Sequence, residues 1–66
     1  MKAVLADLGK KCRESADDHL LVNSFAAELI GESYPVTKSM RDIIFKNYSD
    51  EDLGAKLTGW IDRGKL

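Results

Sequence analysis

Residues 20–31 read LLVNSFAAELIG, and this stretch decides the fold that the sequence predicts. At about 100° per residue, its apolar side chains cover about 180° of a helix surface, and Leu20 lies outside even that arc. A helix with so wide an apolar surface needs neighbours on two sides. We therefore expect it to be the central helix of a small all-α bundle.

The central helix is expected to extend from about residue 16 to residue 31. Ser15 and Asp18 resemble a capping box at its start, with Asp in place of the usual Glu, and Gly31 is a suitable C-terminal stop. The same residues are compatible with a bend in one long helix. The pattern therefore leaves open whether residues 2–31 form one helix or two.

Three further helices are expected, at about residues 2–13, 38–48 and 50–63. Thr37 and Ser49 are placed to cap the last two, and Pro35 keeps the residue before it out of helical geometry. The first and last of the three have narrow apolar stripes of about 100°, typical of helices that bury one side. The sequence predicts a single helical domain over residues 1–66, a bundle of three to four short helices.

Composition sets further limits on the class of protein. The 66 residues are 44% hydrophobic and 32% charged, which is enough apolar material for a core. Ten basic residues against eleven acidic ones give a net charge of -1, unlike proteins whose main task is to neutralise phosphates. Asp7 comes too early for a secretory apolar segment, and no apolar run approaches the length of a membrane span. We expect a cytoplasmic protein with no membrane partner.

The residues that carry catalytic or metal chemistry elsewhere do not form a recognisable site. One Cys (Cys12) and one His (His19) are too few for a closed zinc site. Ser15, Asp18 and His19 have the residue types of a hydrolase triad, but they fall within about one helical turn. The acidic residues 50–52 lack the Gly and Glu that an EF-hand loop requires. The sequence predicts no catalytic residue, no metal, no cofactor and no small-molecule substrate.

The helix expected at 38–48 has more apolar surface than three neighbours can cover. Phe45 and Tyr48 widen its stripe to about 200°, and Arg41 lies between them. Phe45 could instead fold under a loop or be a singly exposed aromatic residue. Because aromatic residues and Arg are the usual anchors of protein interfaces, we expect Arg41, Phe45 and Tyr48 to bind a partner. Trp60 is the fourth candidate contact residue, although its place inside a clean apolar stripe favours a core aromatic.

The predicted function is that of a non-catalytic protein-binding module. It would be a regulator, inhibitor or accessory factor of phage or bacterial origin that binds another protein or itself as a homodimer. Small domains without disulfides or metals often gain stability by association. The expected mechanism is burial of an aromatic and aliphatic patch, oriented by charge pairs of Arg41 and Lys38.

The alternative function is helix-turn-helix-like binding of nucleic acid. The helices at 16–31 and 38–48 would form the motif, and the second would enter the major groove with Lys38, Ser39, Arg41 and Lys46. The connection is long for this motif, Asp42 lies in the middle of the face, and the chain is not basic. Protein binding is therefore the preferred prediction.

Overall fold

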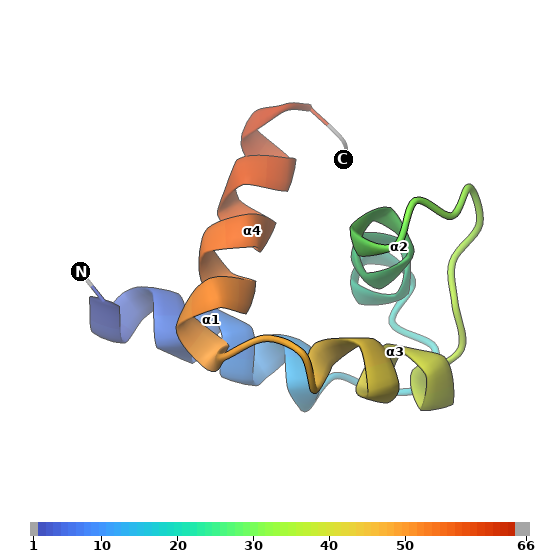
Figure 1. The fold of residues 1–66 in the computed structure, drawn as a ribbon, viewed down its shortest axis with the longest axis horizontal. Helices are drawn as coiled ribbons and strands as arrows, with labels where there is room; N and C mark the ends of the chain where they lie inside the picture. Colours follow the sequence, from blue (N-terminus) through green and yellow to red (C-terminus); the bar gives the residue numbers. More distant parts are fainter. Residues whose placement is uncertain (1, 65–66) are drawn as a thin grey trace.

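The computed structural model describes residues 2–64, and the side chains from Val4 onward within that range. Its secondary structure consists of α1 (Lys2–Arg13), α2 (Leu20–Leu29), α3 (Lys38–Phe45) and α4 (Asp50–Asp62). In Figure 1, α4 crosses α1 steeply, and α2 is seen nearly end-on above α3. The predicted small all-α bundle is confirmed. Met1, Lys65 and Leu66 of the predicted domain lie outside the described residues.

Residues 2–31 form two helices, and the second begins later than expected. α1 ends at Arg13 and α2 begins at Leu20, so the capping box expected at Ser15 is wrong. The Ser15 hydroxyl instead donates to the carbonyl of Lys11 at 2.8 Å. His19 takes the N-cap position of α2, where its ring Nδ1 accepts from the Val22 N–H at 3.4 Å. The residues that connect the two helices can therefore make contacts with another helix of the bundle.

The C-terminal end of α2 follows the sequence signal. Gly31 has a φ of 76°, in the left-handed region that favours glycine. Its N–H donates to the carbonyl of Glu28 at 3.2 Å, and the N–H of Glu32 donates to that of Ala27 at 2.9 Å. This pair of bonds is the Schellman motif, which satisfies the last carbonyls of a helix.

The predicted caps of α3 and α4 are confirmed, whereas the expected end of α3 is three residues too late. The Thr37 hydroxyl accepts from the Met40 N–H at 3.3 Å, and the Ser49 hydroxyl accepts from the Asp52 N–H at 3.1 Å. After Phe45 the chain tightens, because the next three N–H groups donate to carbonyls three residues back. α4 ends at Asp62, with Arg63 as its C-cap.

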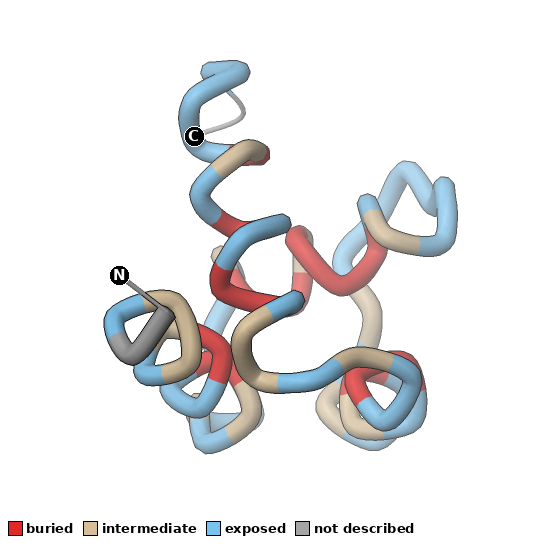
Figure 2. Tube along the Cα trace, turned by 60° about the vertical axis from the view of Figure 1, so that its left-hand side comes forward, coloured by how far each residue is buried: buried red, intermediate tan, exposed pale blue. Residues whose placement is uncertain are grey.

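The core lies where the four helices face one another, and aromatic rings occupy its centre. Phe25 of α2 lies 6.1 Å from the ring of Phe45 on α3 and 5.6 Å from that of Trp60 on α4. Figure 2 shows the buried segments turned toward the inside of the bundle. The buried cluster consists of Cys12, Val22, Phe25, Ala26, Ile44, Phe45, Leu53, Leu57 and Trp60. α2 therefore supplies the ring that joins α3 to α4.

The inward face of α3 is not the aliphatic stripe that its sequence emphasises. Arg41, Ile44 and Phe45 are buried, whereas Met40 and Ile43 are 47% and 59% exposed. Arg41, Ile44, Phe45 and Tyr48 lie within about 100° of one another around the helix. Turning this arc inward buries a large aromatic ring and lets the Arg41 guanidinium reach its acceptors. The apolar residues of α3 that stay exposed are therefore Met40 and Ile43 rather than Phe45.

α1 and α4 cross through a reciprocal pair of glycines. A Cβ atom at Gly9 would lie 1.8 Å from the carbonyl oxygen of Asp50, and one at Gly54 would lie 1.8 Å from that of Leu5. Each helix thus places a glycine against the residue four positions before the glycine of the other. Gly9 lowers the helix propensity of α1 by about 1 kcal/mol, and the crossing is the reason for that cost.

We predict opposite effects for alanine at the three helical glycines. Gly9→Ala and Gly54→Ala each lower the free energy of unfolding by at least about 2 kcal/mol, because the backbones have to separate. Gly59→Ala raises it by about 0.5–1 kcal/mol, because its nearest contact would be the end of the Arg63 side chain at 3.7 Å. Urea denaturation of the three variants measures these differences. Equal effects at Gly9 and Gly59 would contradict the close crossing.

Candidate functional site

Arg41 belongs to the interior, so its predicted place on an open binding surface is wrong. Its side chain is 0% exposed. One terminal nitrogen donates to the carbonyl of Ala16 at 3.2 Å and to the side-chain oxygen of Asn23, and the other donates to the carbonyl of Ser15 at 2.7 Å. Nε has no hydrogen-bond partner among the described residues. The guanidinium therefore joins α3 to α2 and to the connection that precedes it.

Arg13 makes a matching set of contacts from the end of α1. Its Nε pairs with Asp50 Oδ1 at 2.5 Å, and its terminal nitrogens donate to the carbonyls of Phe45, at 2.8 Å, and Tyr48. The first partner lies in the first turn of α4, the Phe45 carbonyl lies at the end of α3, and the Tyr48 carbonyl lies in the turn between the two helices. Arg13 thereby fixes the turn between α3 and α4, and with it the position of Tyr48.

Phe45 is also a core residue, and its expected availability to a partner is wrong. It is 1% exposed and packs against Phe25. The burial has a physical reason, since α3 turns its Arg41 face inward and Phe45 lies one turn beyond Arg41 on that face. Truncation of Phe45 would consequently test folding rather than an interface.

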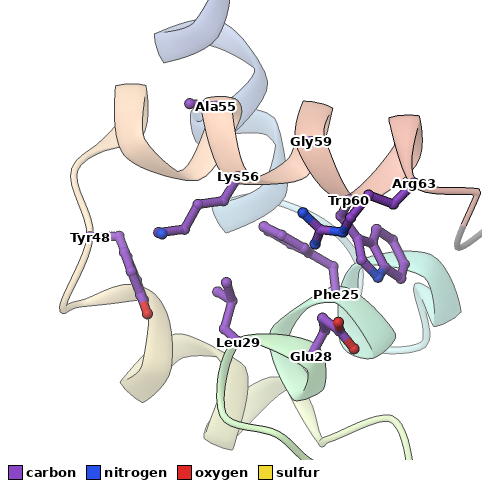
Figure 3. Close-up of a pocket in the computed structure, with 9 residues that line it drawn as sticks. All are labelled: Phe25, Glu28, Leu29, Tyr48, Ala55, Lys56, Gly59, Trp60 and Arg63. Atoms are coloured by element: carbon purple, nitrogen blue, oxygen red, sulfur yellow. The ribbon is translucent and has the colours of Figure 1, made fainter.

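The other two predicted residues, Tyr48 and Trp60, both line a groove between α2 and α4. Trp60 is 5% exposed and belongs to the core cluster, so the core role expected for it is confirmed. The volume of the groove is about 420 Å³. Figure 3 shows α4 along one wall and α2 along the other, with the ring of Phe25 between them. The lining residues are Phe25, Glu28, Leu29, Tyr48, Ala55, Lys56, Gly59, Trp60 and Arg63. The structure thus brings together half of the predicted partner-binding set and adds residues from α2.

The two walls of the groove differ in charge. Lys56 and Arg63 stand on α4, and Lys56 Nζ lies 5.6 Å from the ring centroid of Tyr48. Glu28 stands on α2. In Figure 3 the ammonium group of Lys56 extends toward Tyr48, and the guanidinium of Arg63 lies beside Trp60. The groove therefore has an apolar aromatic floor with cations along one edge and a carboxylate on the other.

A smaller recess of about 150 Å³ adjoins the groove. Glu28 and Trp60 line both spaces. Tyr34 and Pro35 of the connection between α2 and α3 line the far end of the recess. The concave surface consequently continues past Trp60 toward an exposed tyrosine.

The residues expected to bind nucleic acid do not form one basic surface. Arg41 is buried, and Lys38 pairs with Asp42 at 3.0 Å on the same helix. Ser39 and Lys46 are exposed. The cationic surface of α3 is thus smaller than the helix-turn-helix alternative requires, and that alternative stays a prediction.

The groove residues that sequence reasoning missed are Phe25, Glu28, Leu29, Lys56 and Arg63. Phe25 and Leu29 were assigned to the central apolar stripe, which is correct, but a stripe does not show where neighbouring helices diverge. A usable signal was present on α4. Lys56 and Arg63 are seven residues apart and therefore share a helix face with the small residues Ala55 and Gly59.

Comparisons with known proteins give no further assignment. No family model, no curated protein and no solved structure matches this chain. Among the helices in residues 2–64, none combines the length and the apolar character needed to cross a membrane.

We predict that Arg41 is required for folding. Arg41→Met keeps much of the volume but leaves three acceptors without a donor, at about 1–3 kcal/mol for each that water does not reach. That loss is comparable to the whole stability of a domain of this size, so the variant is largely unfolded. Far-UV circular dichroism with urea titration measures this. Lys38→Met on the same helix is the control and changes stability by about 0.5 kcal/mol. A stable Arg41→Met variant would show that the hydrogen bonds of the buried guanidinium are not required for folding.

We predict that Cys12 makes the stability of the fold sensitive to alkaline pH. Burial raises the pKa of the Cys12 thiol above its ordinary value of 9.0, although the charges of Arg41 and Arg13 act in the opposite direction. The folded state then holds this proton more tightly than the unfolded state, so stability falls as the pH rises past 9.0. The slope has an upper limit of about 1.4 kcal/mol per pH unit for one proton. Urea titrations from about pH 8 to 10.5 should give a flatter profile for Cys12→Ala. Parallel profiles would show that other groups cause the loss.

Proposed function

We propose that the protein is a small helical binding module that recognises another protein through the groove between α2 and α4, without catalysing a reaction. The observation that carries this proposal is a groove of about 420 Å³ that side chains of the bundle leave unfilled. Its accessible apolar surface comes mainly from the half-buried Leu29 and Tyr48, because Phe25 and Trp60 at its base are only 1% and 5% exposed. Tyr48 and Arg63 stand at its edge. Tyr, Trp and Arg are the residue types most enriched among interface hot spots.

The chemistry of the groove favours binding over catalysis. Cys12, a residue type that serves as a nucleophile in many enzymes, is in the buried core and is not among the lining residues. His19, a residue type that serves as a general base, caps α2 and does not line the groove either. The lining supplies an apolar floor and charged edges, which is the usual anatomy of a protein interface.

In the cell, this module would act as a regulator, inhibitor or accessory factor in the cytoplasm. A phage or bacterial origin is part of this proposal. A second copy of the chain is the other occupant that the groove could accept, as a homodimer. Sedimentation at two concentrations distinguishes that case, because only self-association depends on the concentration of this chain alone.

The proposal predicts that filling the groove abolishes capture of a partner. Gly59→Phe places a ring over the groove from a position that now has no side chain. Thr58→Phe puts the same ring on α4 about 100° around the helix, outside the lining, and is the matched control. We expect one protein from a lysate of the source cell to be retained by the wild type and by Thr58→Phe, and to be reduced about tenfold or more by Gly59→Phe.

Both variants are first checked for native stability and helix content. A partner that all three proteins capture equally would show that the groove is not the binding surface. A shift of random duplex DNA at moderate salt, lost steeply as salt increases, would favour the nucleic-acid alternative instead.

A further inference from the structure

The two cations that line the groove, Lys56 and Arg63, form no ion pair with an acidic residue among residues 4–64. Among residues 4–64 the ion pairs are Arg13 with Asp50 and Lys38 with Asp42. Lys56 faces the ring of Tyr48, and Arg63 folds back toward Gly59. Within the described part of the chain, both groove cations thus face an apolar concavity without a carboxylate in contact.

The spacing of these cations specifies a ligand geometry. Lys56 lies on α4 and Arg63, seven residues further on, is the C-cap of that helix, so their Cα atoms lie on one face and about 10.5 Å apart along the helix axis. Trp60 lies between them in the sequence and on the floor of the groove. A complementary ligand therefore carries two anionic groups about 10 Å apart with an apolar group between them.

An α-helix meets this requirement better than an extended chain. Helix residues seven apart share a face at the same 10.5 Å or so, and those at the third and fourth places between them share it too. In a strand, side chains on one face are about 6.6 or 13 Å apart, so neither spacing matches. Ala55 and Gly59 add to the preference, because small residues let a second helix approach the backbone of α4.

We infer that the groove binds an acidic amphipathic helix of the partner protein, with two carboxylates seven residues apart on Lys56 and Arg63 and apolar side chains over Trp60. This inference rests on the proposed function and names the chemistry of the partner. Glu28 on the opposite wall repels carboxylates placed on that side. The acidic edge of the bound helix therefore lies along α4, and its neutral or basic edge lies along α2.

Synthetic helices test the inference directly. The probe is an alanine-based peptide of about 18 residues, long enough to form helix, with two glutamates seven residues apart and leucines at the third and fourth places between them. A second peptide carries lysines in place of the glutamates, and a third carries prolines that prevent helix formation. Trp60 is the one tryptophan of the chain and reports on the groove by fluorescence. We expect the glutamate peptide to bind about tenfold more tightly than the lysine peptide at low salt.

Charge variants of the protein supply the second arm of the test. Lys56→Gln and Arg63→Gln each lower the affinity for the glutamate peptide by about threefold to fivefold, as expected for charge pairs at an exposed rim. Lys11→Gln, an exposed lysine on α1 outside the groove, is the matched control and leaves the affinity unchanged. The double variant Lys56→Glu with Arg63→Glu should prefer the lysine peptide. Circular dichroism confirms that each variant is folded.

The outcomes separate this inference from the proposed function. Equal binding of glutamate and lysine peptides, or absence of binding while Gly59→Phe still abolishes capture of the natural partner, would overturn the acidic helix and leave the groove as the binding surface. Tighter binding of the proline peptide would overturn the helical form of the ligand. Tighter binding of a single-stranded oligonucleotide than of the glutamate peptide would overturn a protein ligand for these cations. Equal capture of the natural partner by Gly59→Phe and Thr58→Phe would contradict both proposals.

Discussion

The fold depends on one positive charge that has been taken out of water. A guanidinium stays protonated in proteins, so the cost of burying Arg41 has to be offset by hydrogen bonds. Two backbone carbonyls and the amide oxygen of Asn23 supply them, and no described carboxylate forms an ion pair with it. Because these acceptors belong to the α1–α2 connection and to α2, the charge holds three segments in one arrangement. Arg13 makes a second connection of this kind, from the end of α1 to the turn before α4.

The features of the fold that depend on neighbouring residues could be predicted from the sequence. Thr37, Ser49 and Gly31 act within a few positions of themselves, and each has the role that its residue type indicates. The start of α2 was misjudged because Ser15 has a second use, bonding back to α1. The orientation of α3 was misjudged because arginine residues usually lie at the surface, and the sequence does not show the distant acceptors of Arg41. Those acceptors lie 18 to 26 positions away in the sequence, beyond the reach of any periodic pattern.

The same distinction explains which parts of the candidate site were found. Tyr48 and Trp60 were singled out as aromatic residues at the edges of apolar stripes, and both line the groove. Arg41 and Phe45 satisfied the same criterion and are core residues, and Trp60, although it lines the groove, is a core residue as well. Residue type and helical spacing identify what is able to anchor a partner, but only the crossing of α2 and α4 decides which of those side chains still meet open space. The cations at the edge of the groove were overlooked because a charged residue on a helix is usually just solvated.

The glycine crossing of α1 and α4 has a consequence for how the chain acquires its fold. It joins Leu5 and Gly9 to Asp50 and Gly54, so this close backbone approach connects segments about 45 positions apart. Closing so long a loop costs entropy before the contact gives anything in return, which slows folding relative to bundles built from sequential neighbours. During synthesis, moreover, α1 emerges from the ribosome long before its partner exists. The amino-terminal helix therefore lacks its closest-packed partner until residues 50–62 have been translated.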